Sequence, residues 1–560
     1  MTSSLKSISL LTLLTALSVA CQPDKSEFIM AKPESVAMLE PINKYAALKT
    51  YLNTSENPNF KLGASVSLTD YLANGVMARM VNSNFNDITL GNEMKHGALV
   101  KADGKLDFSN VINLLKAAQT AGVSVHGHTL TGHTNQNAAY LNSLLLTGVD
   151  FDPADKRVNY VNGSFEQNQT GWNSWGGSST RDVINTGLVG TKSLRYTHTS
   201  KANPWDAQIA LDFSPAPVPV GEYTLSFFVR SDAPGKFRCS TVGTGSDVQY
   251  QADVITGTGW QYVEWNIKSA GTLSALRYDM GTTPGTYYLD EVRLNPRSTL
   301  YRAPVILQLS ADEKAKIIGA AQEKFITEML TQTKSYVKAW NVVNEPMDDA
   351  KPNTLKTAVG RTGIPTNEFY WQDYIGKDYA VNAFKLARQH GNPGDVLFIN
   401  DYNLENDLNK CRGLIEYVNY IESKGAKVDG IGTQMHMTLD TKRENIDQMF
   451  QLLAATGKMI RVSEMDIAIG GGIKTAAATP AQYKAQAELY EYAIKKYMEI
   501  VPAKQRYGIT MWSLMDSADG AAWRAGEPIG LWKRDFTRKQ AYGGFANGIA
   551  GRDVSADFKK

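Results

Sequence analysis

Cysteine and histidine are scarce in this 560-residue chain, which contains three cysteines and seven histidines. Cys21, Cys239 and Cys411 form neither a Cys-x-x-Cys pair nor a cluster with histidine, which argues against a structural zinc site. The glycine run 470–472 is not followed by Lys-Ser/Thr, so it does not form a phosphate-binding loop. We therefore expect no metal ion and no cofactor. A disulfide is also not expected, because Cys239 and Cys411 fall in segments assigned below to different domains.

An excess of charge of one sign is absent too. The 58 basic and 56 acidic residues give a net charge of +2, whereas a nucleic-acid-binding protein usually carries a basic patch and a higher isoelectric point. No nucleic-acid partner is therefore expected. Hydrophobic residues make up 43% of the chain and charged residues 20%, which is ordinary globular composition and excludes a mostly disordered or collagen-like protein.

Long apolar runs are missing, and the longest stretch near the start, Ile8 to Val19, is too short to span a membrane as a mature helix. It follows the basic Lys6 and ends in small residues before Cys21, a pattern typical of an export signal. The segment resembles a bacterial lipoprotein signal. The resemblance implies that residues 1–20 are removed, that Cys21 is lipidated, and that residues 21–35 tether the protein to the cell envelope, at the outer membrane or the cell surface. The alternative is a plain secretory signal with an accidental cysteine.

Short apolar strands alternate with helical patterns over residues 36–152 and again over residues 300–550, which indicates parallel βα units. Eight strands can be counted, and this number predicts an α/β fold, a (β/α)8 TIM barrel, with functional residues at the C-terminal ends of the strands. The expected strands lie at residues 60–66, 85–90, 123–128, 337–343, 396–400, 429–435, 459–467 and 507–513.

Residues 157–297 interrupt this alternation between the third and fourth strands. They lack long helical periodicity, are rich in glycine, serine, threonine and aromatic residues, and contain short alternating runs such as 223–229 and 287–292. These features predict an all-β sandwich inserted into the barrel.

Two carboxylates stand where predicted strands end. The fourth strand ends in a run that includes Asn344-Glu345-Pro346, and the seventh ends in Val462-Ser463-Glu464-Met465-Asp466. One such glutamate alone is more often a salt bridge or a solvated rim residue, but a pair facing each other across a barrel mouth is what glycoside cleavage requires. One carboxyl group protonates the leaving oxygen, and the other attacks the anomeric carbon or activates water. Polar side chains end other strands nearby, at His128, Gln434 and His436.

The strand-end motifs resemble those of glycoside hydrolase family 10, whose members are in practice endo-β-1,4-xylanases. They occur in order and cover nearly all of the α/β part. The matching segments are Asn92-Glu93-Met94-Lys95, Gly127-His128-Thr129-Leu130 with His133, Trp340 to Pro346, Asn400-Asp401-Tyr402-Asn403, Gly430 to His436, Ser463-Glu464-Met465-Asp466, and Trp512 with Trp523 and Arg524.

The resemblance implies a retaining mechanism with Glu345 as the general acid/base and Glu464 as the nucleophile. It implies that the pKa of Glu345 is raised by the negative nucleophile, and that the carboxyl groups lie about 5–5.5 Å apart. His436 would orient the nucleophile. The further residues implied to bind substrate are Asn92, Lys95, His128, His133, Asn344, Tyr402, Gln434, Trp512, Trp523 and Arg524.

Three positions depart from the family pattern. Gly91 stands where the family usually has glutamate, Gly132 where it has tryptophan, and Asn341 where it has aspartate. The two glycines remove a sugar hydrogen bond and an aromatic floor near the non-reducing subsites, which would widen the cleft for a decorated xylan backbone. Asn341 removes a charge close to His128 and would change its protonation.

The inserted segment resembles a carbohydrate-binding module of the family 4/9/22 type, in the opening run 159–166 and the closing run 287–292. Such modules hold glycan chains by aromatic stacking and hydrogen bonds. Trp205 with Gln208, and then Trp175, are the candidate ligand residues; Phe165, Trp172 and Trp260 are expected in the core.

The leading hypothesis is a lipid-anchored, monomeric endo-xylanase whose partner is the polysaccharide. Two alternatives remain. One is a related barrel glycosidase acting on mixed-linkage xylan or β-glucan. The other is a catalytically weak glycan-binding surface protein.

Overall fold

The computed structural model describes residues 40–146, 148–199, 202–213, 217–244 and 248–559. Eight parallel strands form its largest sheet in the order β18-β17-β16-β3-β2-β1-β21-β20, and pairing of β18 with β20 closes the sheet into a barrel. The predicted (β/α)8 barrel is confirmed, and each expected strand is present within a few residues. The strands are β1 (Lys61–Val66), β2 (Asp87–Leu90), β3 (Ser124–Thr131), β16 (Ala339–Asn344), β17 (Val396–Asp401), β18 (Gly430–Thr433), β20 (Met459–Ala468) and β21 (Arg506–Met511), with a short β19 (His436–Thr438) beside β20.

Helices surround the barrel and begin where the sequence provides caps. Ser310 and Glu313 form a capping box at the start of α8, and Thr479 and Gln482 form another at α13. Their buried residues recur at helical spacing and face the strands. The helices are α3 (Leu68–Leu72), α4 (Val76–Asn84), α5 (His96–Leu99), α6 (Ser109–Thr120), α7 (Ala138–Ser143), α8 (Ala311–Thr333), α9 (Gln372–Ile375), α10 (Tyr379–His390), α11 (Leu408–Ser423), α12 (Arg443–Ala455), α13 (Pro480–Ile500) and α14 (Gln540–Ala550).

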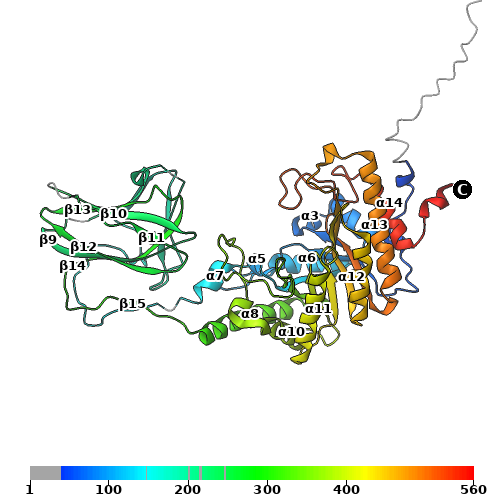
Figure 1. The fold of residues 1–560 in the computed structure, drawn as a ribbon, viewed down its shortest axis with the longest axis horizontal. Helices are drawn as coiled ribbons and strands as arrows, with labels where there is room; N and C mark the ends of the chain where they lie inside the picture. Colours follow the sequence, from blue (N-terminus) through cyan, green and yellow to red (C-terminus); the bar gives the residue numbers. More distant parts are fainter. Residues whose placement is uncertain (1–39, 147, 200–201, 214–216, 245–247, 560) are drawn as a thin grey trace, which may run out of the picture.

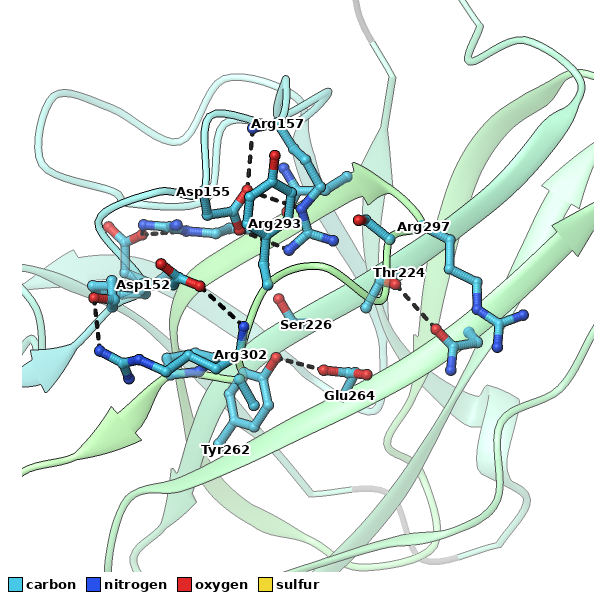
Figure 2. Close-up of a pocket in the computed structure, with 18 of the residues that line it drawn as sticks. Asp152, Asp155, Arg157, Thr224, Ser226, Tyr262, Glu264, Arg293, Arg297 and Arg302 are labelled. Carbon is cyan, nitrogen blue, oxygen red and sulfur yellow. Dashed lines mark hydrogen bonds and ion pairs between the residues drawn. The ribbon is translucent and has the colours of Figure 1, made fainter.

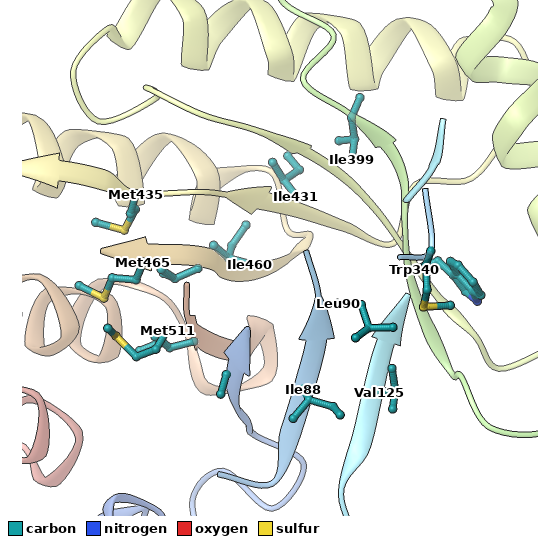
Figure 3. Close-up of a cluster of buried hydrophobic side chains, with 14 of the residues drawn as sticks. Ile88, Leu90, Val125, Trp340, Ile399, Ile431, Met435, Ile460, Met465 and Met511 are labelled. Carbon is teal, nitrogen blue, oxygen red and sulfur yellow. The ribbon is translucent and has the colours of Figure 1, made fainter. Parts of the chain in front are cut away.

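Large apolar side chains pack around and inside the barrel (Figure 3). Trp340 on β16 is fully buried and pairs in register with Gly127 on β3. A Cβ atom at position 127 would lie 2.2 Å from the Trp340 ring, so only glycine fits there. This close approach fixes β3 and β16 against each other and so aligns the strand ends that carry His128 and Glu345.

The inserted residues fold as a sandwich of two antiparallel five-stranded sheets, as predicted, and Figure 1 shows it to one side of the barrel. Phe165 and Trp172 are buried between the sheets, whereas Trp260 is only half-buried and lies beneath the Arg230 guanidinium. One sheet contains β11 (Val254–Thr256), β10 (Gly235–Gly243), β13 (Leu273–Asp279), β8 (Ala207–Asp212) and β5 (Trp172–Gly176); the other contains β12 (Gln261–Ser269), β9 (Gly221–Ser231), β14 (Gly285–Pro296), β7 (Ser193–His198) and β6 (Thr180–Ile184).

Two chain segments form a neck between barrel and sandwich, where β4 (Val149–Asp150) pairs with β15 (Val305–Ile306). A pocket lies where the neck meets the β12-β9-β14 face (Figure 2). Its four arginines all have carboxylate partners; the Arg302–Asp150 and Arg157–Asp155 contacts, for example, measure 2.8 and 2.7 Å. The charges of these four arginines are thus paired with neighbouring carboxylates.

Cys239 and Cys411 are buried, unpaired thiols, in agreement with the expectation of no disulfide between them. Within the described residues no helix is both long and apolar enough to cross a membrane. The proposed signal, Cys21 and the tether at 21–35 lie outside the described residues.

Candidate active site

Glu345 follows the last residue of β16 and has a positive φ of 56°, an unfavourable conformation for a residue with a side chain. Its backbone N–H donates to the Asn400 carbonyl oxygen at 2.7 Å, which holds the turn in place. The Gln434 amide donates to Glu345 Oε1 at 2.9 Å. The other oxygen, Oε2, lies 3.9 Å from both His133 Nδ1 and Lys356 Nζ. The carboxyl group is thus fixed between an amide, an imidazole and an ammonium.

The expectation of a raised pKa for Glu345 is wrong. Burial does raise it, but the charges of Lys356 and His133 and the hydrogen bond from Gln434 outweigh burial and lower the pKa to about 2. Burial and Lys356 also lower the pKa of His133 to about 4, so His133 is neutral near pH 7 and Lys356 is the lasting cation. In the free protein Glu345 is therefore a carboxylate, the form that acts as a base.

Glu464 lies within β20 and is 4% exposed. Asn400 donates its amide to Glu464 Oε1 at 3.0 Å and to Asn344 Oδ1 at 2.8 Å. Ser463 in turn donates to Asn400 Oδ1 at 2.6 Å, which fixes the orientation of that amide. The Glu464 backbone N–H donates to the Gln434 carbonyl oxygen at 3.1 Å. Gln434 therefore contacts both glutamates, one through its side chain and the other through its backbone.

His436 lies between two carboxylates, with Nε2 3.6 Å from Glu464 Oε2 and Nδ1 3.1 Å from Asp466 Oδ1. Burial lowers its pKa, but Asp466 and Glu464 raise it to about 10, so His436 carries a proton at neutral pH. Asp466 also accepts from Trp523 Nε1 at 2.8 Å and lies 3.4 Å from Arg524. Asp466 thus contacts all three of the sequence-predicted residues His436, Trp523 and Arg524. Of these, His436 also lies beside the candidate nucleophile Glu464.

His128 and His126, on β3, share the side chain of Asn341. The Asn341 amide donates to His128 Nδ1 at 3.0 Å, and its oxygen lies 3.0 Å from His126 Nε2. Burial and the nearby Lys95 hold the pKa of His128 well below its usual range. With Nδ1 accepting, the single proton of His128 sits on Nε2. Trp512 covers this ring edge-on at 5.8 Å.

The loop after β2 supplies the predicted Asn92 and Lys95, and Lys95 Nζ donates to Asn92 Oδ1 at 3.2 Å. A Cβ atom at the neighbouring Gly91 would have no atom nearer than 4.0 Å, and one at Gly132 none nearer than 3.5 Å. A Cβ atom at Gly132 would thus be in ordinary contact with Thr129 and Asn344, whereas Gly91 has more space around it.

Tyr402, predicted from the motif after β17, lies among charged groups. Lys356 Nζ donates to its hydroxyl at 3.0 Å, the hydroxyl donates to Asp349, and the buried Lys410 ammonium lies 3.6 Å from the centre of its ring. Lys410 is itself paired with Asp349 and Asp401. Lys356, in the loop after β16, belongs to this network, and its ammonium lies beside Glu345.

Several residues at the site received no role from the sequence. Asn400 and Asp466 belong to the strand-end motifs described above, and this position is the feature of the sequence that could have identified them as site residues. Lys356 lies in an irregular loop well after Glu345, and no spacing rule connects the two.

In the module, the structure brings the predicted residues to one sheet. Trp175 on β5 pairs in register with Gln208 on β8, and Gln208 donates to Asp279 on β13 at 2.5 Å. Trp175 is 43% exposed and has the Arg277 guanidinium 5.2 Å from its ring centre. Trp205, 57% exposed, lies in the turn that leads into β8. Trp175 and Gln208 thus lie on neighbouring strands, with the Arg277 guanidinium beside the Trp175 ring, and are here called the Trp175 row.

A family model for glycosyl hydrolase family 10 matches residues 51–213 and 303–548, most of the chain. The chain belongs to glycosyl hydrolase family 10. A second model, for a carbohydrate binding domain, matches residues 159–278 within the inserted sandwich.

Curated relatives of this family 10 chain include the endo-beta-1,4-xylanase Xyn10C of Cellvibrio japonicus, 27% identical over 253 residues that cover 41% of this chain and 40% of the relative. The endo-1,4-beta-xylanase A of Thermoanaerobacterium saccharolyticum is 32% identical over 179 residues, 32% of this chain and 14% of that one. The chain thus spans less than half the length of these relatives. Among solved structures, the intracellular xylanase of T. saccharolyticum covers 90% of this chain and 99% of its own at 17% identity with a TM-score of 0.51, a likeness of fold.

Proposed function

We propose that this family 10 barrel hydrolyses β-1,4-xylosidic bonds within xylan chains, with retention of configuration. The observation that carries the proposal is the arrangement of Glu345, directly after β16, and Glu464, within β20, both contacted by Gln434. The names of the xylanase relatives support xylan as the substrate class.

In the first step, the Glu464 carboxylate attacks the anomeric carbon of the sugar while a proton moves from Glu345 to the departing glycosidic oxygen. The glycosidic bond breaks, a glycosyl ester forms on Glu464, and the shortened chain leaves with a free hydroxyl. The Asn400 amide and His436 contact the two oxygens of Glu464 and orient it for this attack.

In the second step, Glu345 takes a proton from water as the water oxygen attacks the same carbon, which releases the sugar and restores both carboxyl groups. The lowered pKa of Glu345 keeps it in the carboxylate form that this step requires. For the first step Glu345 must gain a proton, and a bound chain helps it do so by excluding the water that solvates the carboxylate.

A glucan-cleaving barrel and a weak glycan binder are less favoured. Both candidate catalytic glutamates are present and hydrogen-bonded, which argues against a lost activity. Gly91 and Gly132 remain the reason to test mixed-linkage substrates.

The test is to incubate the protein with linear xylan, glucuronoarabinoxylan and mixed-linkage β-glucan and to size the products, with Glu464→Ala as the inactive control. Xylo-oligosaccharides from wild type alone support the proposal. Cleavage of the β-glucan alone would replace the proposal with the hypothesis of a related barrel glycosidase. If no glycan gave any product, the hypothesis of a catalytically weak glycan-binding protein would remain.

We infer that the module holds a glycan chain along the Trp175 row, because exposed rings beside hydrogen-bonding groups suit sugar faces and hydroxyls. Trp175→Ala should weaken retention on insoluble xylan about tenfold, whereas Ile255→Ala, which removes another exposed apolar side chain of the module, should not. Equal retention of both variants would contradict this.

We also propose that Cys21 is lipidated, that the protein is anchored at the cell envelope as a monomer, and that the module keeps the barrel near polysaccharide. The run of apolar residues before Cys21 supports the anchor. Labelled fatty acid should be incorporated into wild type and not into Cys21→Ser, and the variant should leave the membrane fraction. Incorporation by both would contradict the anchor.

A further inference from the structure

His126 is a buried histidine on β3 that the proposed mechanism does not use. Its ring packs beside Phe398 and Tyr507, with ring centres 5.6 and 6.2 Å away. Its Nε2 lies 3.0 Å from Asn341 Oδ1, whereas its Nδ1 is buried and has no hydrogen-bond partner among the described residues. Such a half-paired imidazole is uncommon, because buried polar groups usually have partners.

The surroundings of His126 place its proton on Nε2. Burial and the Arg461 cation hold the pKa of His126 well below its usual range, so the ring is neutral near pH 7 and carries one proton. On Nδ1 that proton would be a buried donor without an acceptor, which costs free energy. On Nε2 it meets the Asn341 oxygen, so Nε2–H donates to Asn341 Oδ1.

This donor decides how the Asn341 amide is turned. Because Oδ1 accepts from His126, the amide nitrogen lies on the opposite side and donates to His128 Nδ1 at 3.0 Å. The His128 proton is then on Nε2. If the amide were turned over, its oxygen would accept from a proton on His128 Nδ1, and Nε2 would carry none.

The other nitrogen of His128, Nε2, makes no hydrogen bond to any residue that the structure describes. Lys95 and Glu345 lie close enough for their charges to act on the pKa of the ring. His128 therefore stands among groups proposed to hold and cleave the sugar, with Nε2 available for a substrate hydroxyl.

We propose that His126 is a positioning residue, which acts through Asn341 to fix the proton of His128 on Nε2, where it donates to a sugar hydroxyl. The inference rests on the proposed function, because it takes a xylose residue to lie beside His128. A hydroxyl that accepts from Nε2–H keeps its own proton to donate to a carboxylate, whereas a bare Nε2 would take that proton instead. His126 thus sets the direction of hydrogen bonding to the sugar without touching it.

Labelling with ¹⁵N-histidine tests the proton positions directly, because the chain has only seven histidines. Two-bond ¹H–¹⁵N correlation spectra of the full-length protein, recorded near pH 7 without substrate, distinguish a proton on Nε2 from one on Nδ1. His126→Phe removes the donor and keeps a ring beside Phe398. Phe398→Leu is the matched control, since it loosens the packing around His126 and leaves the donor in place. Signals missing from His126→Phe and from His128→Asn assign the two histidines.

In wild type and in Phe398→Leu, His126 and His128 should both carry their proton on Nε2. In His126→Phe, either orientation of the Asn341 amide leaves one of its groups unpaired, so His128 should divide between its two tautomers. The value of kcat/KM on xylohexaose should then fall by the same factor as the share of His128 with a proton on Nε2, about twofold to tenfold.

A proton on Nδ1 of His128 in wild type would overturn the proposal, and so would an unchanged His128 tautomer in His126→Phe. A shifted tautomer with unchanged kcat/KM would overturn the role in sugar binding. An equal loss of kcat/KM in Phe398→Leu would show that packing, and not the donor, matters. If wild type cleaves no xylohexaose, the proposed function fails instead, and the spectra, recorded without substrate, keep that failure separate from a wrong proton position.

Discussion

The two glutamates proposed to be catalytic, Glu345 directly after β16 and Glu464 within β20, have different surroundings. Glu464 is held by the Asn400 amide and by His436, whose pKa is raised to about 10 because it lies between Glu464 and Asp466. Glu345 is held by Gln434 and lies beside Lys356, which contributes to lowering its pKa to about 2. Both therefore face a cation, although a retaining mechanism needs an ionised nucleophile and, at first, a protonated acid.

The difference teaches that the free protein is arranged for the second half of the reaction. In the proposed mechanism, Glu345, whose pKa is lowered to about 2, must gain its proton after the chain has bound. Substitutions around Glu464 should therefore lower activity on every substrate. The effect of substitutions around Glu345 on activity should depend on pH and on the leaving group.

The largest expected effect comes from removing either carboxyl group. Glu464→Ala should lose activity by on the order of 10⁴-fold or more on every substrate, because no glycosyl ester can form. Glu345→Ala should lose about 10²- to 10⁴-fold on xylan, yet keep its first step on an aryl xyloside whose leaving group needs no proton. Burst kinetics with the aryl substrate, followed by addition of azide, separates the two variants. Azide rescue of Glu464→Ala in place of Glu345→Ala would exchange the assigned roles.

Asn400→Asp should give the next largest effect. The substitution keeps the shape of the side chain but replaces the donor to Glu464 with a second negative charge, which disfavours the ionised nucleophile. We expect about a 10²-fold loss of kcat/KM near neutral pH and an acidic limb of the pH profile at higher pH. Asn409→Asp, which adds the same charge at an exposed position near the start of α11, is the matched control and should behave as wild type.

Lys356→Met tests the Glu345 side. Without the ammonium the pKa of Glu345 should rise, so the protonated acid persists to higher pH in the complex and the alkaline limb of kcat should move up by about one pH unit. Activity above the wild-type limb would then increase by up to about tenfold. The exposed Lys351→Met on the same loop is the control. An unchanged limb in Lys356→Met would show that this cation does not govern the acid.

Much of this site was predictable because strand order fixes where motif residues meet. Once eight strands are counted, Glu345, Glu464, His128 and Gln434 must converge at the C-terminal ends. Lys356 could not be predicted in this way, because the course of an irregular loop depends on its packing against other loops. The prediction of a raised pKa for Glu345 was wrong for the same reason. It took account of the second carboxylate, Glu464, and not of the Lys356 ammonium beside Glu345.

The module shows the same limit in another form. Its strands and buried rings followed from alternation, and Trp175, Trp205 and Gln208 were singled out by their position in loops or beside them. The register that places Trp175 opposite Gln208 is a long-range pairing, which no local pattern determines.

Asn341→Asp should have the smallest effect and concerns the wall of the cleft near both glutamates. Asn341 donates to His128 Nδ1, and burial and Lys95 keep the pKa of that imidazole well below its usual range. An aspartate would accept from Nδ1 and stabilise the imidazolium, which raises the pKa of His128. We expect a few-fold change in kcat/KM together with a new titration between about pH 5 and pH 7. The new titration should disappear in the double variant Asn341→Asp with His128→Asn. If Asn341→Asp shows no added titration, the amide of Asn341 does not set the protonation of His128.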